Sequence, residues 1–199
     1  AVSLETANIT MIRDNDPGNL ATLTLANTKS AATNNGDLLF TVAHPKLASA
    51  TITGPTGHIK FTSLPALTTV DLTGADAFDV HASGNAVLAS WTDASKAEDR
   101  IFDNNDLMTS VTLSATTKLT ATSDKAVSVS VDGNAELTSL TISMDDVEDL
   151  SITDNPKLAT IAATGLADNG TSTSASAAVY NNAFVASSVK DTYETAATR

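Results

Sequence analysis

The chain contains no cysteine and few aromatic or charged residues. Of its 199 residues, 4% are aromatic and 17% are charged, whereas ordinary globular domains carry about 25% charged residues. The lack of cysteine excludes disulfides and thiolate metal sites. No apolar run approaches the ~18 residues that a membrane-spanning helix needs. We therefore expect no membrane span and no cysteine-based site.

Basic residues are also scarce, with 11 Lys and Arg against 23 Asp and Glu, which gives a formal net charge of −12. Such a polyanion is repelled by the phosphate backbone of nucleic acids, so we expect no nucleic-acid partner. The first residue is Ala1 rather than methionine, which fits a removed signal peptide or a trimmed chain. Together with the acidic balance, this predicts an extracellular or cell-surface location.

Hydroxyl-bearing residues take the place of the missing charges. The chain has 31 Thr and 20 Ser. Threonine favours strands because its β-branched side chain fits a pleated surface. The composition therefore predicts β structure rather than a helical bundle.

A segment of the form Asn-Pro-Lys-Leu recurs along the chain in degenerate copies. The clearest copies are residues 44–47 and 155–158, and each copy ends on an apolar anchor residue. The spacings between anchors are 27, 20, 21, 20, 29 and 21 residues, and the two long spacings indicate loop insertions. A recurring period of this length is typical of a solenoid. The anchors are Leu20, Leu47, Leu67, Leu88, Met108, Leu137 and Leu158.

Apolar and polar residues alternate on both sides of most anchors. Apolar pairs such as Leu140 and Ile142 follow an anchor, and pairs such as Leu150 and Ile152 precede one. A period of two is typical of strands, and one coil buries its apolar face only against the next coil. The sequence predicts an all-β fold, namely a single-domain β-solenoid (β-helix) of coils of about 20 residues over residues 20–165. We expect residues 1–19 to form an N-terminal cap or exchanged strand, and residues 166–199 to form a C-terminal cap.

Four repeats carry asparagine three residues before the anchor. An asparagine amide offers two donors and an acceptor, and asparagine tolerates left-handed turns. Stacked at one corner, these amides can satisfy turn backbone groups in successive coils, and contact with a ligand is the alternative role. The four residues are Asn85, Asn105, Asn134 and Asn155.

The segment from Leu150 to Leu158, and more loosely that from Leu137 to Ile142, resembles the receptor L domain. This family is a leucine-rich-repeat-like, right-handed β-helix found in growth-factor receptors and fungal cell-wall proteins. In degenerate form the resemblance extends over residues 20 to 165, although the repeats here are shorter and lack cysteine. The resemblance implies a β-helical fold and says almost nothing about the partner.

Side chains two, four and six residues after each anchor are expected to point away from the core. Of these 21 positions, 17 are Ser or Thr, against roughly nine expected once apolar residues are excluded. This predicts a flat, hydroxyl-bearing face. It is either a soluble surface, a contact between subunits of a fibre, an O-glycosylation surface, or an ice- or carbohydrate-binding face. The candidate residues are Thr22, Thr24, Ser49, Thr51, Thr53, Thr69, Thr73, Ser90, Thr92, Ser110, Thr112, Ser114, Ser139, Thr141, Ser143, Thr160 and Thr164.

Motifs that carry catalytic or metal chemistry are missing. His44, His58 and His81 fall in different repeats without the spacing of a metal site, so we expect them at turns or on the surface. There is no phosphate-binding loop, no nucleophile elbow and no EF-hand spacing in the acidic run 145–149. We expect no enzyme, no cofactor and no metal, with paired acids on adjacent coils for polysaccharide cleavage left as the open alternative. Asn8 and Asn169 match the N-glycosylation pattern and are candidate sites.

These observations favour a non-enzymatic, secreted structural or adhesive surface protein, namely a self-assembling subunit of an extracellular filament or matrix. Segments outside the repeats can be exchanged between copies by strand addition. The expected partners are therefore other copies of the chain or surface glycans. The alternative is an ice- or carbohydrate-binding protein that uses the Ser/Thr-rich face.

Overall fold

The computed structural model is all-β over the residues that it describes, which confirms the prediction from composition. The structure describes residues 2–5, 20–26, 38–40, 44–55, 57–77, 79–95, 97, 99–114, 127–144, 147–164, 176–180 and 182. Every regular element within these ranges is a strand, and none of them is helical. Short alternating segments form these strands, because turn-forming Pro, Gly and Asn interrupt them at close intervals.

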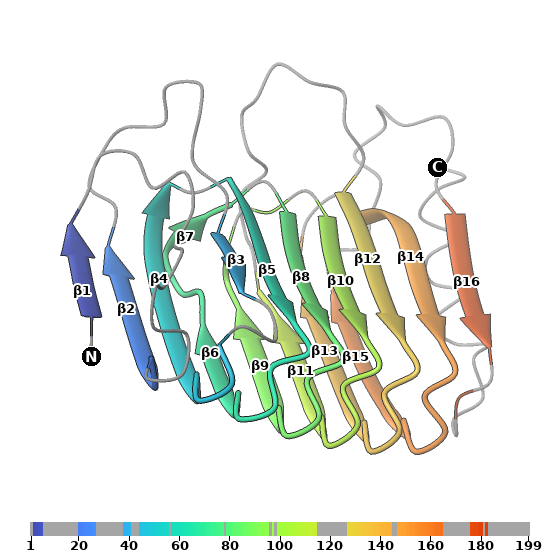
Figure 1. Ribbon diagram of the computed structural model, residues 1–199. Coiled ribbons are helices and arrows are strands. Elements are labelled where there is room, and N and C mark those ends of the chain that lie inside the picture. The colour runs from blue at the N-terminus through green and yellow to red at the C-terminus, as the bar shows by residue number, and fades with distance from the viewer. Residues whose placement is uncertain are drawn as a thin grey trace.

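The strands form two large parallel sheets (Figure 1). The nine-stranded sheet has the spatial order β1 (Val2–Glu5), β2 (Thr22–Ala26), β4 (Ser49–Pro55), β6 (Thr69–Asp71), β9 (Ser90–Asp93), β11 (Ser110–Leu113), β13 (Ser139–Ser143) and β15 (Thr160–Thr164), with β7 (Ala75–Asp76) beside β4. The seven-stranded sheet has the order β16 (Ser176–Tyr180), β14 (Val147–Thr153), β12 (Val127–Asp132), β10 (Asp99–Asp103), β8 (Asp79–Ser83), β5 (His58–Thr62) and β3 (Leu38–Phe40).

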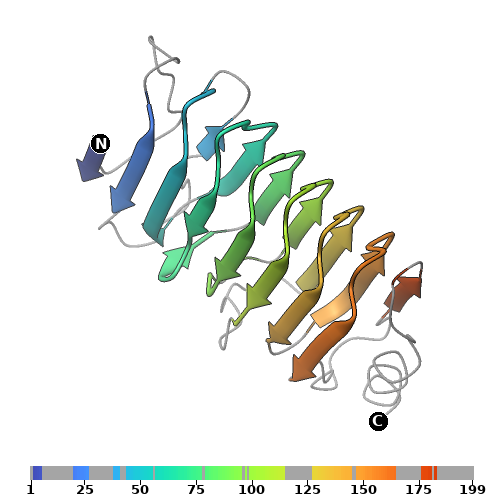
Figure 2. The ribbon, with the colours of Figure 1, turned by 90° about the horizontal axis from the view of Figure 1, so that it is seen from below.

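From β2 onward the chain alternates between the two sheets, so each circuit adds one strand to each of them, with β7 as an additional short strand of the nine-stranded sheet. Figure 2 shows the strands in two rows that follow one another from the N-terminal to the C-terminal end. The register is constant over long stretches, as where Ser110 pairs with Ser90 on one side and with Ser139 on the other. A bulge between Val127 and Ser128 shifts the pairing of β12 with β14. Equivalent positions of successive circuits therefore lie in columns.

The anchor residues lie in the core between the sheets, as the sequence predicts. Leu20 is 9% exposed and the six later anchors are fully buried. An aromatic column runs beside them, in which Phe40 stacks on Phe61 at 5.1 Å between ring centroids and Trp91 meets Phe61 and Phe102 edge-on. Each fully buried large apolar side chain stabilises the fold by about 1.5–3 kcal/mol. The stack is therefore held together mainly by contacts between successive circuits.

The Asn-Pro-Lys-Leu motif is a β-turn that leads into a strand of the nine-stranded sheet. The N–H of Leu158 donates to the carbonyl of Asn155 at 3.0 Å. The same bond closes the turns at the five preceding anchors. Proline after the first turn residue, as at Pro156, suits this geometry because its fixed φ matches the second position of the turn.

Buried asparagines at these turns form a continuous asparagine ladder through the stack. The side-chain oxygen of Asn134 accepts hydrogen bonds from the backbone N–H and the amide of Asn105, at 3.0 and 3.3 Å. Its own amide donates to Asn155 at 3.2 Å and to the carbonyl of Phe102 at 2.9 Å. This confirms that the amides satisfy turn backbone groups. Equivalent bonds join the remaining members, Asn85, Asn105, Asn155 and Asn182.

The residue before each of four ladder positions has a left-handed backbone, with φ between 53° and 64°. At Gly133 a Cβ atom would lie 2.7 Å from Oδ1 of Asn104, so both the conformation and the space favour glycine there. At Asn104 and Asp154 the same conformation is filled by residue types that tolerate it. The left-handed residues are Gly84, Asn104, Gly133 and Asp154, with Ser63 at the equivalent turn before Leu64.

Both predicted caps contain a strand of a large sheet. The strand β1 pairs in parallel with β2 of the same chain, and β16 pairs in parallel with β14. Asn182 adds a further rung to the asparagine ladder. The seven-stranded sheet therefore continues past residue 165, where the sequence places the end of the repeats. The other residues of the two predicted caps lie outside the described ranges.

Candidate functional site

The outer face of the nine-stranded sheet carries two columns that run the length of β2 to β15. Strand register aligns residues two and four positions after each anchor, and all of them are exposed or half-buried. We call these two columns the hydroxyl face. The first column is Thr22, Ser49, Thr69, Ser90, Ser110, Ser139 and Thr160, and the second is Thr24, Thr51, Asp71, Thr92, Thr112, Thr141 and Ala162.

The third predicted column, six residues after each anchor, is discontinuous. Thr53 and Ser143 lie on strands of the sheet, whereas Thr73 and Ser114 lie beyond the ends of β6 and β11. Thr164 ends β15, and its side chain is outside the described part of the structure. The two glycosylation candidates, Asn8 and Asn169, also lie outside the described residues.

The hydroxyl face offers neutral hydrogen-bonding groups in a regular array. Within it, the hydroxyl of Ser49 donates to Oγ1 of Thr22 at 3.4 Å. Asp71 is the one charged residue of the two columns, and its carboxylate accepts the N–H of Thr73 at 2.9 Å. Hydroxyls spaced by the strand separation of ~4.8 Å can bind ordered water, sugar hydroxyls or another flat β surface. The two columns are therefore mainly an array of neutral groups that can donate and accept hydrogen bonds.

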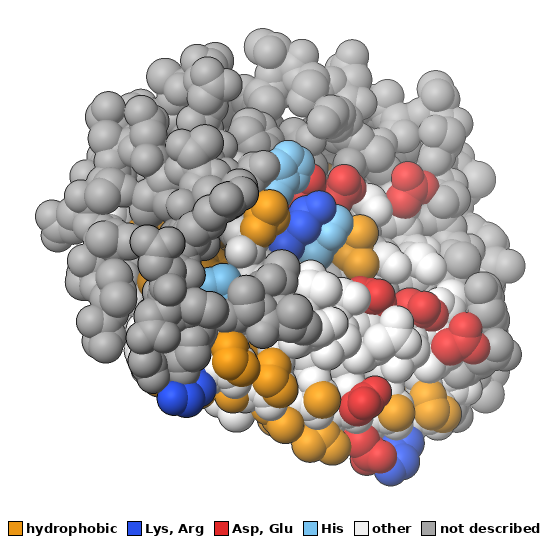
Figure 3. Space-filling model, in the orientation of Figure 1, with side chains coloured by type: hydrophobic (Ala, Val, Ile, Leu, Met, Phe, Trp, Pro, Cys, Tyr) orange, Lys and Arg blue, Asp and Glu red, His pale blue; other side chains and the backbone are white. Residues whose placement is uncertain are grey.

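The outer face of the seven-stranded sheet is charged, and Figure 3 shows His and Lys side chains gathered on one part of it. His58 forms an ion pair with Asp79 on the next strand, and Lys60 pairs in register with His81. Burial lowers the pKa of His81, and the positive charge of Lys60 lowers it further, while Asp79 and Asp99 oppose the shift. This group near the N-terminal end is therefore mixed, since His58 contacts a carboxylate and Lys60 lies beside a second histidine.

Acidic residues dominate the same face toward the C-terminal end. Asp103 and Asp132 are register partners on β10 and β12. The hydroxyl of Ser83 donates to Asp103 at 3.0 Å, and that of Thr153 donates to Asp132. Two half-buried carboxylates thus lie on adjacent strands, which is the arrangement left open above for polysaccharide cleavage. Exposed Asp154 and Asp149 continue the acidic surface on and after β14.

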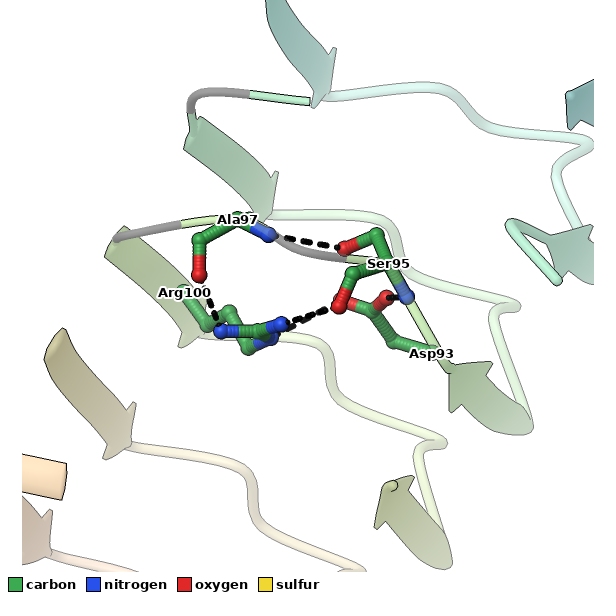
Figure 4. A network of polar contacts seen from close by, with 4 residues as sticks. All are labelled: Asp93, Ser95, Ala97 and Arg100. Carbon is green, nitrogen blue, oxygen red and sulfur yellow. Dashed lines mark hydrogen bonds and ion pairs between the residues drawn. The ribbon is translucent and has the colours of Figure 1, made fainter. Parts of the chain in front are cut away.

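A buried ion pair lies where the chain passes from β9 to β10 (Figure 4). Nε of Arg100 contacts Asp93 at 3.3 Å, and the guanidinium also donates to the carbonyls of Ala97 and Ser95, at 2.5 and 2.6 Å. The carboxylate of Asp93 accepts the N–H of Ser95 at 2.6 Å. Burial lowers the pKa of Arg100, and Asp93 opposes that shift. The pair satisfies the polar groups of a tight connection from inside the core.

Sequence reasoning missed the Asp93–Arg100 pair and the charged face. Asp93 occupies a position that is apolar in most other repeats, and Arg100 aligns with Val80 and Val129. A charged residue at a position that the repeat places in the core was therefore the sequence signal for a buried ion pair. His44 lies at a turn, as predicted, and it is buried against Phe40.

Comparisons with family models, curated proteins and solved structures give no match for this chain. The resemblance to the receptor L domain therefore stays a prediction. Over the described ranges, no group of three or more His, Cys, Asp or Glu side chains is arranged to hold a metal ion. Within those same ranges no helix is long and apolar enough to cross a membrane.

Proposed function

We propose that the chain is a β-solenoid of coils of about 20 residues. In this proposal it serves as a secreted, non-enzymatic structural or adhesive surface protein that assembles into an extracellular filament or matrix. The observation that carries the proposal is the construction of the nine-stranded sheet. All of its large pairings are parallel and share one direction, and within the described residues its path ends on β1 at one side and on β15 at the other. Strand edges of this kind template pairing with further chains.

Two further features support a structural role. The asparagine ladder and the column of buried anchors make successive circuits interdependent, which favours a rigid rod over a mobile scaffold. The hydroxyl face is uncharged except at Asp71, so it can approach another flat surface without electrostatic repulsion.

Negative-stain electron microscopy of the purified chain at high concentration tests this function, with light scattering to follow assembly over a concentration series. We expect filaments whose axial repeat is about 38 Å if eight stacked strands, each about 4.8 Å from the next, make one subunit. Monodisperse particles of single-chain size at the highest concentration would contradict self-assembly.

A second function is favoured by the hydroxyl face itself, since its first column is Ser or Thr on all seven strands. Such an array matches the recognition of ice or of sugar hydroxyls. Thermal hysteresis and ice shaping test the ice version, with Thr51→Tyr and Thr141→Tyr expected to abolish the effect. Ser130→Tyr, on the outer face of the other sheet, is the matched control. If the parent chain shows no thermal hysteresis, the ice-binding version of this function is excluded.

A further inference from the structure

The two ends of the nine-stranded sheet are complementary edges. Among the described residues, β1 pairs only with β2, and β15 pairs only with β13. Because every strand on this path runs in the same direction, the outer edge of β15 offers the hydrogen-bonding pattern that the outer edge of β1 can complete. A simple translation of one copy along the stack would bring these two edges together.

The core is less completely covered at the C-terminal edge. Six inward residues form a buried column along β2 to β13, and each is at most 5% exposed. Ile161 continues this column on β15, yet it is only partly buried. The column therefore lacks a full cover on its last strand, which the apolar residues of another copy could supply. The six buried members are Leu23, Ala50, Val70, Trp91, Val111 and Leu140.

Charge on the seven-stranded sheet also has a direction. Lys60 and His58 lie on β5, near the N-terminal end, whereas Asp149 and Asp154 lie on and after β14, near the C-terminal end. Figure 3 shows the Lys and His side chains gathered on one part of this face, with acidic side chains both beside them and toward the C-terminal end. Contact between two C-terminal ends would bring these carboxylates together. The charges at the C-terminal end therefore disfavour association through two like C-terminal ends.

We propose that copies of this chain associate head to tail, with β1 of one copy pairing in parallel with β15 of the next. This rests on the proposed function and specifies its interface. The register follows from the pairings within the chain. Val2 aligns with the column that ends at Ile161, and Ser3 aligns with the column that ends at Ala162. Such a contact joins two different surfaces and does not close on itself, so it generates an open filament.

The absence of native cysteine allows this register to be tested by disulfide cross-linking. In the variant Ser3→Cys/Ala162→Cys, the two positions are about 34 Å apart within one chain, which is seven strand separations. A disulfide needs Cα atoms within about 7 Å, so oxidation can join these cysteines only between copies. We expect a ladder of dimers, trimers and longer oligomers on a non-reducing gel, which a reductant collapses to monomer.

The control Glu5→Cys/Ala162→Cys is displaced by two residues in register, and we expect at least about tenfold less cross-linked product from it because the diagonal separation exceeds the disulfide range. Mixing the two single variants, Ser3→Cys and Ala162→Cys, should stop the ladder at mixed dimers. Circular dichroism under reducing conditions shows that each variant is folded before oxidation.

The outcomes separate this interface from the proposed function. Filaments of the parent chain together with a ladder from the Ser3/Ala162 variant support both. If filaments form but the Ser3/Ala162 variant gives no cross-linked oligomers, the β1–β15 interface is overturned. It is also overturned if the shifted control gives as much cross-linked product. In both cases the filament is built through another surface. If neither filaments nor cross-linked oligomers form, the interface and the proposed function are overturned together.

Discussion

Removing one rung of the asparagine ladder tests whether this ladder stabilises the stack. The change Asn134→Ala leaves the backbone N–H of Asn105 and the carbonyl of Phe102 without their side-chain partner. Both groups bond to a fully buried residue, and a buried unsatisfied polar group costs about 1–3 kcal/mol. We expect the free energy of unfolding to fall by about 4 kcal/mol, a large part of the roughly 5–15 kcal/mol typical of a domain.

Urea unfolding measures this loss, with circular dichroism for the sheets and fluorescence of Trp91 for the core. Trp91 is the single tryptophan and is buried between Phe61 and Phe102, so its emission reports on the stack directly. Ser130→Ala, a half-buried position on the outer face, is the control. If the free energies of unfolding of Asn134→Ala and Ser130→Ala differ by less than about 1 kcal/mol, the asparagine ladder is not a major source of stability and the reasoning is refuted.

Three other predictions concern charge, pH and backbone. Asp93→Leu and Arg100→Val should each lower the free energy of unfolding by about 3–5 kcal/mol, since each leaves a buried charge unpaired. The double variant should lose clearly less than the sum, and additive losses in urea unfolding would contradict the pairing. Because the pKa of His81 lies below 6.5 in the folded chain, the unfolded state binds the proton more readily, so stability should fall as pH drops below 6.5. His81→Gln should flatten that part of a stability–pH profile, and an unchanged slope would exclude His81 as its source. Gly133→Ala should lower the melting temperature more than Gly84→Ala, because an added Cβ meets Asn104 at 2.7 Å in the first case and Ser63 at 3.4 Å in the second. Equal shifts would show that the close approach at Gly133 is relieved.

The core and the turns could be predicted from the sequence because their signals are local. An apolar anchor three residues after an asparagine marks a turn, and alternation after the anchor marks a strand, so Asn155 and Leu158 identify their own roles. The same rule could have found Asn182, which is followed three residues later by Val185. Asn182 was not recognised because the residue at the anchor position is valine rather than leucine.

The charged features could not be predicted, because they depend on contacts between circuits. Lys60 and His81 are 21 residues apart in the chain and become neighbours only through the register of β5 and β8. Arg100 was missed for a different reason, since a charged side chain is ordinarily assigned to the surface. Its burial depends on how the connection after β9 folds back on Asp93.

The asparagine ladder has a consequence for how such a chain can grow in evolution. At the interior rungs the side-chain oxygen accepts bonds from the preceding rung, and the amide donates one bond to the oxygen of the next rung. These rungs therefore present the same two contacts along the stack. A tandem duplication of the segment from Asn85 to Asn104 would insert a circuit that already fits both of its neighbours. The chain can therefore gain or lose whole circuits without other changes to the core. An insertion of only part of a circuit would instead leave one asparagine amide without its hydrogen-bond partner.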